Sequence, residues 1–111
     1  MANATGPTVR TWSATASSGG AGDYGRYFVG TLLPQLRELP GFAGAYLLRR
    51  DLDQDGIVEL TAHTFWDSAE AIRAFAGDDI TVAIVEPEAQ GMLLDFDRTA
   101  THRSVLADAR T

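Results

Sequence analysis

Apolar and polar residues alternate along residues 9–16 and 57–66, a period of two that is typical of strands with two unlike faces. We also expect strands at 42–52 and 93–102. Apolar residues recur every three or four positions over 23–39, which predicts a helix, and a second helix is predicted at 67–76. The expected order is strand, helix, strand, strand, helix, strand.

Local signals predict how the two helices begin and end. Asp67 is expected to accept the first free backbone N–H groups of the second helix, with Glu70 reaching back to the Asp67 N–H. Gly77 is expected to end that helix. Pro34 removes one N–H donor from the first helix, so we expect a kink or two joined pieces there.

The segments between these elements are predicted to be turns and loops. Asp53-Gln54-Asp55-Gly56 is expected to be a hairpin turn, because Asp-Gly tolerates the positive φ that tight hairpins need. Residues 17–22 and 86–91 are expected to be loops. Residues 80–85 fit either a short strand or one helical turn, and the flanking aspartate and proline favour a short helix.

This order of elements predicts an α+β, ferredoxin-like βαββαβ fold: a four-stranded antiparallel sheet with both helices on one face. The apolar row of the third strand should face the helices, and it consists of Val58, Leu60, Ala62, Thr64 and Trp66. The opposite row carries Phe65, an apolar side chain whose exposure to water is unfavourable. A second copy packed face to face would cover it, so we expect a homodimer.

The bulk properties restrict the class of protein. The 111 residues suit one domain, and we expect a flexible N-terminus at 1–8, the domain at 9–102 and a C-terminal tail at 103–111. The net charge of −6 argues against nucleic acid or an anionic membrane surface as a partner. The chain has no cysteine, which excludes disulfides and thiolate metal ligands. No secretion signal and no membrane-spanning run is evident, so we expect a cytoplasmic protein.

Three segments resemble the antibiotic biosynthesis monooxygenase domain family, within the dimeric α+β barrel superfamily. They are Leu39-Pro40-Gly41-Phe42-Ala43-Gly44-Ala45, Thr64-Phe65-Trp66-Asp67-Ser68, and the following helix with Ala71 and Phe75. The resemblance covers residues 9 to about 102. It implies the dimeric barrel fold, and an activity among those of the family: cofactor-independent oxygenation of aromatic polyketides or quinols, or haem degradation.

One departure argues against haem degradation. In the haem-degrading members a histidine after the second helix binds iron, and its position here falls near Val85. An asparagine on the first strand assists in those members, and residues 10–16 contain none. Only Trp66 matches the trio. We therefore expect no cofactor and no metal.

Trp66 and His63 are the candidate catalytic residues. In several relatives the tryptophan that matches Trp66 lines the cavity between helices and sheet, where an indole offers a flat wall and one N–H donor. A core tryptophan that fills the gap between sheet and helices is an equal alternative. His63 can deprotonate a phenol near neutral pH, although its place on the opposite face of the strand favours the dimer interface. His102 is expected to face solvent.

Trp12, Tyr27, Tyr46 and Trp66 are the candidate substrate-binding residues, although each is also suited to an ordinary core. Gly20-Ala21-Gly22-Asp23-Tyr24-Gly25 satisfies the G-x-G-x-x-G pattern of dinucleotide sites. Asp23 places a negative charge where phosphate would lie, so we interpret this stretch as a flexible loop at the cavity mouth.

The resemblance, taken with these candidate residues, implies a cofactor-independent monooxygenase that acts on a small planar aromatic, polyketide- or quinol-like molecule. A deprotonated phenol or quinol can pass an electron to dioxygen directly, so the protein need only bind, deprotonate and orient it. Two alternatives remain open: a non-catalytic dimeric barrel that binds a hydrophobic metabolite, and an isomerase or cyclase on the same scaffold.

Overall fold

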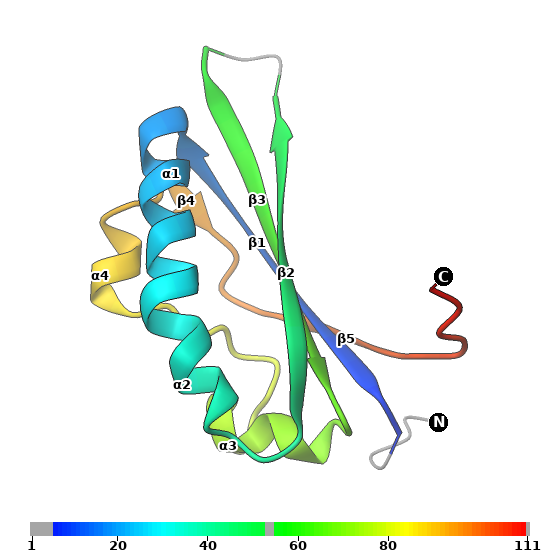
Figure 1. Cartoon of the computed structure of the whole chain (residues 1–111). Helices are drawn as coiled ribbons and strands as arrows, with labels where there is room; N and C mark the ends of the chain where they lie inside the picture. Colours follow the sequence, from blue (N-terminus) through cyan, green and yellow to red (C-terminus); the bar gives the residue numbers. More distant parts are fainter. Residues whose placement is uncertain (1–5, 53–54, 111) are drawn as a thin grey trace.

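Strand β1 (Thr8–Ser17) lies inside an antiparallel sheet and pairs along its whole length with β3 (Ile57–Trp66) in the computed structural model, which describes residues 6–52 and 55–110. Strand β2 (Phe42–Asp51) borders β3 on the other side. The opposite edge of β1 carries β4 (Asp95–Phe96) and β5 (Thr101–Ser104). The helices cover one face of this sheet (Figure 1). The predicted ferredoxin-like α+β fold is therefore confirmed.

The sequence predicts one continuous strand over 93–102, but this strand is interrupted, because residues 98–100 leave β1 between β4 and β5. There they bond the segment after the second helix: the Ala83 N–H donates to the Arg98 carbonyl at 3.0 Å, and the Ala100 N–H donates to the Thr81 carbonyl at 2.8 Å. Val82 and Thr99 form an isolated bridge. Residues 80–85 therefore form neither the strand nor the helix that the sequence allowed.

The first helix begins earlier than predicted and has three parts: α1 (Ser18–Tyr27), a π-helical turn η1 (Phe28–Leu32) and α2 (Leu33–Arg37). Ser17 starts α1, since its Oγ accepts the Gly20 N–H at 3.0 Å. Residues 17–22 are thus not a loop, and the glycine-rich stretch forms helical turns. The prediction of joined pieces is confirmed, with Pro34 in the first turn of α2.

The second helix is shorter than predicted: a 3₁₀ turn η2 (Glu70–Ile72) leads into α3 (Arg73–Ala76). Its first N–H group is not capped by Asp67. The Ser68 Oγ accepts the Ala71 N–H at 3.1 Å, while the Asp67 N–H donates to the Gly41 carbonyl at 2.8 Å.

Some of the predicted helix ends, loops and turns are found in the structure, and others are not. Gly77 ends α3 with φ +83°, as predicted. Residues 86–91, predicted as a loop, contain the short helix α4 (Pro87–Gln90). In the β2–β3 turn, Asp55 and Gly56 have φ +37° and +75°, as a tight turn needs. Residues 53 and 54 of that predicted turn lie outside the described residues.

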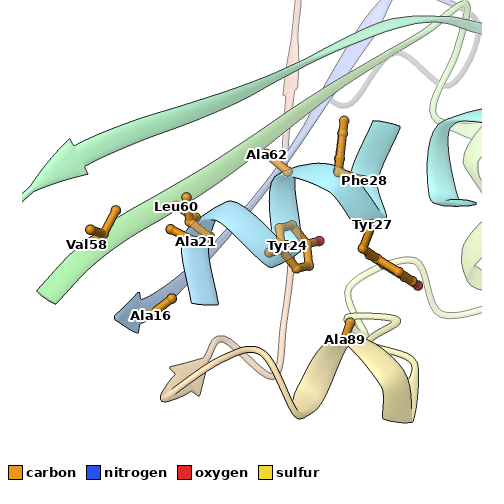
Figure 2. Packing of buried hydrophobic residues seen from close by; sticks show 9 residues of the cluster. All are labelled: Ala16, Ala21, Tyr24, Tyr27, Phe28, Val58, Leu60, Ala62 and Ala89. Atoms are coloured by element: carbon orange, nitrogen blue, oxygen red, sulfur yellow. The ribbon is translucent and has the colours of Figure 1, made fainter. Parts of the chain in front are cut away.

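The core lies between the helices and the helix-facing row of the sheet. The predicted row of β3 is buried, with Val58 and Trp66 each 1% exposed. One cluster gathers side chains of β1, α1, β3 and α4 (Figure 2). A second cluster joins Trp66 to Leu36 and Ile72. Within the described residues, no helix is long and apolar enough to cross a membrane.

Candidate functional site

A small cavity of about 40 Å³ lies between the first helix and the sheet. Strands β1 and β3 form its floor, the first helix forms one wall, and α3 and the segment after it complete it. Its walls are mostly apolar and aromatic, and the residues that line it are Arg10, Trp12, Tyr24, Phe28, Leu32, Leu36, Ala62, Thr64, Phe75 and Ile84. The cavity therefore offers an apolar, partly aromatic environment with one charged side chain.

Trp12 lies in the wall of this cavity, and its predicted role in substrate binding stays a prediction. Its indole N–H is already engaged, because it donates to the Asp97 carbonyl at 2.8 Å. The ring is tilted against Tyr24, with centroids 6.0 Å apart, and against Phe96, with centroids 6.5 Å apart. Trp12 thus presents an aromatic surface to the cavity and no free donor.

Trp66 lies outside the cavity wall, which corrects the expectation that it lines the pocket. Its side chain is 1% exposed and packs between Phe42, with ring centroids 5.3 Å apart, and Phe75, with centroids 6.4 Å apart. The indole N–H donates to the Thr64 Oγ1 at 2.9 Å. Trp66 is therefore a core tryptophan, which was the alternative interpretation of the sequence. It touches the cavity wall only indirectly, because its neighbours Phe75 and Thr64 line the cavity.

His63 and Tyr46 lie on the face of the sheet that the helices do not cover, so the structure does not bring them to the cavity. They are paired across β3 and β2, and His63 is also opposite Thr11 of β1. Tyr46 is 51% exposed and meets the Phe65 ring edge-on at 5.4 Å. The strict alternation of β3 separates His63 from the cavity, and its role as a base stays a prediction.

Tyr27 lines an adjoining cavity of about 30 Å³, together with Tyr24, Val85 and Glu86 among others. Burial, followed by the charges of Glu86 and Glu88, raises the pKa of Tyr27. Burial, followed by Tyr27, also raises the pKa of Tyr24 above its ordinary value of 10.0. Both phenols therefore stay protonated at neutral pH and can donate hydrogen bonds.

Arg10 is the residue of this site that sequence reasoning missed. It is only 5% exposed and lies on the helix-facing side of β1, two residues before Trp12. The signal was present in the alternation, because Arg10 shares the row of Trp12, Ala14 and Ala16. A charged residue in an otherwise apolar row indicates a buried charge.

Neutral groups surround the Arg10 guanidinium. Its Nη1 donates to the Ile80 carbonyl and lies 3.0 Å from the His102 Nε2, and its Nη2 donates to the Val82 carbonyl at 3.0 Å. Burial lowers the pKa of Arg10 from 12.5 to about 10, so the group remains cationic at neutral pH. His102 is half-buried and does not simply face solvent as predicted. Burial and then the Arg10 charge lower the pKa of His102.

In the part of the chain that the structure describes, no group of three or more histidine, aspartate or glutamate side chains is arranged to bind a metal ion.

Solved structures with the same fold include proteins named as monooxygenases. One is an antibiotic biosynthesis monooxygenase by name, from Bacillus cereus, with 17% identity over 95% of this chain and 98% of that one and a TM-score of 0.66. Another is the monooxygenase ActVA-Orf6 of Streptomyces coelicolor, in complex with nanaomycin D, with 18% identity over 96% and 93% and a TM-score of 0.61. SnoaB of Streptomyces nogalater, a cofactor-independent oxygenase, has 20% identity over 93% and 95% and a TM-score of 0.50.

These similarities confirm, at the level of fold, the resemblance to antibiotic biosynthesis monooxygenases. No protein-family model matches the sequence, and no curated protein matches it significantly.

Proposed function

We propose that this protein is a cofactor-independent monooxygenase that acts on a planar, electron-rich aromatic molecule bound beside Trp12. The observation that carries the proposal is the cavity itself, which joins aromatic walls from β1, α1 and α3 to a single buried cation. Aromatic walls favour a planar ring, and the Arg10 charge favours its deprotonated form. The fold shared with proteins named as monooxygenases supports the same reaction class.

The reaction is balanced without a cofactor. A phenol or anthrone loses a proton, and the resulting anion passes one electron to dioxygen. The two radicals combine into a carbon-bound peroxide, and loss of water leaves a carbonyl on the ring. One oxygen atom of dioxygen enters the product and the other leaves as water. The substrate supplies the two electrons that reduce this second oxygen atom. The task of the protein is to bind, orient and favour the anion.

Ligand entry requires movement of the cavity wall. The cavity of about 40 Å³ is far smaller than pockets for drug-sized ligands, which are typically about 300–1,000 Å³. Ile84 is 39% exposed and lies in the irregular segment after α3, so it separates the cavity from solvent. We expect this segment to move outward when a planar ligand binds.

Oxygen consumption tests the proposal directly. Purified protein should consume dioxygen with a member of a panel of anthrones and hydroquinones, faster than the uncatalysed reaction. Ala62→Leu places extra volume in the cavity and should abolish the activity, whereas Ala74→Leu on the exposed side of α3 should not. If no member of the panel is oxidised faster than in buffer, the proposal is wrong.

The open face of the sheet supports a homodimer as part of this proposal. Tyr46 is 51% exposed and Leu48 is 44% exposed on β2, where they pair with His63 and Thr61 of β3. A structure with the same fold is described as a dimeric ferredoxin-like protein from an uncultured marine organism, with 7% identity and a TM-score of 0.55. Light scattering should give the mass of two chains, and Leu48→Asp should give one.

A second candidate function is binding of a hydrophobic metabolite without turnover. Among the described residues that line the cavity, none is a carboxylate or a histidine, so a general base is not supplied there. An isomerase or cyclase needs such a base, as the proton loss in the proposed oxygenation does, so this observation does not separate those reactions. Saturable binding of anthrones without oxygen uptake would favour this second function.

A further inference from the structure

Arg10 is a buried cation whose surroundings do not balance its charge. Buried arginines in proteins are normally paired with a carboxylate, because removing a cation from water costs several kcal/mol. Among the described residues, the salt bridges involve Arg26, Arg49, Arg50, Arg73 and Arg110, and none involves Arg10. Its partners are two backbone carbonyls and one imidazole.

Arg10 lies in the wall of the cavity, and its guanidinium lies close to another residue of that wall. Arg10 lines the cavity beside Thr64, its partner across β1 and β3, and the remaining walls are apolar or aromatic. The guanidinium carbon is 5.7 Å from the centroid of the Phe75 ring, which also lines the cavity. A positive charge beside a mostly apolar cavity attracts an anion more strongly than the same charge in water.

The carbonyl contacts alone suggest a purely structural role, in which Arg10 fastens residues 80–82 to β1. That role uses the donor capacity of the guanidinium and does not require a charge. A neutral side chain with N–H donors, or an apolar side chain in a core, would avoid the cost of burying a cation. The retained charge is explained if a ligand supplies the missing negative partner.

We propose that Arg10 makes this cavity an anion-binding site, which takes its aromatic ligand as a phenolate, enolate or carboxylate with the charged oxygen directed toward the guanidinium. The anion site and the proposed monooxygenase site are the same cavity, and in this respect alone the inference rests on the proposed function. It requires binding but no turnover.

The test compares two ligands of nearly equal shape and different charge. Binding of 2-naphthoate and of neutral 2-naphthamide is measured at pH 7.5 by isothermal titration calorimetry. The wild-type protein should bind the anion about tenfold or more tightly, as a charge-assisted hydrogen bond implies. Arg10→Met should bind both ligands with similar affinity, and Arg10→Lys should retain part of the preference.

Arg73→Met is the matched control, because Arg73 is an exposed arginine on α3 that pairs with Glu70 at 3.4 Å. It should keep the full preference for the anion. The proposal is overturned if the wild-type protein binds both ligands equally or binds neither, or if folded Arg10→Met keeps the preference. If Arg10→Met does not fold, the test depends on Arg10→Lys. The proposal is then overturned if Arg10→Lys binds 2-naphthoate no more tightly than 2-naphthamide.

The outcome is separable from that of the proposed function. A preference for naphthoate without oxygen uptake from any anthrone leaves the anion site standing and removes the monooxygenase. Oxygen uptake that persists in Arg10→Met, with no preference between the two naphthalenes, removes the anion site and leaves the monooxygenase standing.

Discussion

His102 Nε2 lies 3.0 Å from Arg10 Nη1 in a half-buried position between β5 and β1. A guanidinium has only donors, so the His102 Nε2 must accept, and the proton of the neutral ring lies on Nδ1. A protonated His102 would set two donors and two positive charges against each other. The contact therefore exists only in the neutral form of the imidazole.

This contact predicts a loss of stability at mildly acidic pH. The pKa of His102 is lowered in the folded chain from an ordinary value of 6.5, so below that value the unfolded chain binds a proton that the folded chain does not. The free energy of unfolding should fall as pH decreases through this range toward the lowered pKa. Urea denaturation at a series of pH values measures it.

His102→Gln keeps an acceptor for Arg10 and cannot titrate, so its stability should depend less on pH over the same range. His63→Gln is the matched control, because His63 lies on the opposite face of the sheet and does not contact Arg10. Equal pH dependence in the wild-type protein and His102→Gln would contradict the assignment.

Truncation of the Trp66 side chain should strongly lower the stability of the fold. The side chain is 1% exposed and joins β3 to α2 and α3 through its cluster, so Trp66→Ala should lower the free energy of unfolding by about 3–5 kcal/mol. That is a large share of the ~5–15 kcal/mol of a typical domain. Chemical denaturation followed by circular dichroism measures the loss, and a loss below about 1 kcal/mol would contradict the packing described.

Thr64→Val tests the hydrogen bond between the Trp66 indole and the Thr64 hydroxyl. Valine has nearly the same shape but leaves the buried indole N–H without its acceptor, which costs about 1–3 kcal/mol. The control is Thr61→Val on the same strand, since the Thr61 hydroxyl pairs with Ser13 on the open face. We expect a clearly smaller loss of stability in the control.

Gly41→Ala should destabilise the junction between the first helix and β2. Gly41 has φ +86°, and an added Cβ would lie 2.6 Å from the Ala71 Cβ. The left-handed backbone alone costs about 1–2 kcal/mol for a residue with a side chain, and the contact adds to it. Gly30→Ala in η1 meets no atom within 4 Å and should be neutral or stabilising. Thermal unfolding compares the two variants.

The clash can be separated from the backbone strain. Ala71→Gly in the Gly41→Ala background removes the opposing Cβ, so it should restore part of the lost stability beyond what Ala71→Gly does alone. Additive effects of the two substitutions would show that only the backbone conformation matters.

The periodicity predicted most of the fold because the apolar rows and the helix spacing are properties of local sequence. The buried row that ends at Trp66, the end of α3 at Gly77 and the division of the first helix near Pro34 all follow from residue types at fixed spacings. Asp67 was expected to cap the second helix, but the neighbouring Ser68 does so. The reason is tertiary: the Asp67 N–H is bonded to Gly41, far away in the sequence.

The candidate site was less predictable because it depends on contacts between distant segments. Alternation showed that His63 and Trp66 face opposite sides of β3, but it did not reveal that Phe75 lies between Trp66 and the cavity. The environment of Arg10 is formed by residues 80–82 and His102, which are far from Arg10 in the sequence. Only its place in the apolar row of β1 indicated burial in advance.

The departure of residues 98–100 from the sheet has a consequence for the kinetics of ligand binding. The segment that covers the cavity is bonded to these residues at Ala83 and Thr81 and to Arg10 at Val82. We expect outward movement of Ile84 to be coupled to the opening of these neighbouring hydrogen bonds. Association rates should follow the hydrogen-exchange rate of the Ala83 and Ala100 amides, and ligands of different affinity should enter at similar speed and differ in how fast they leave.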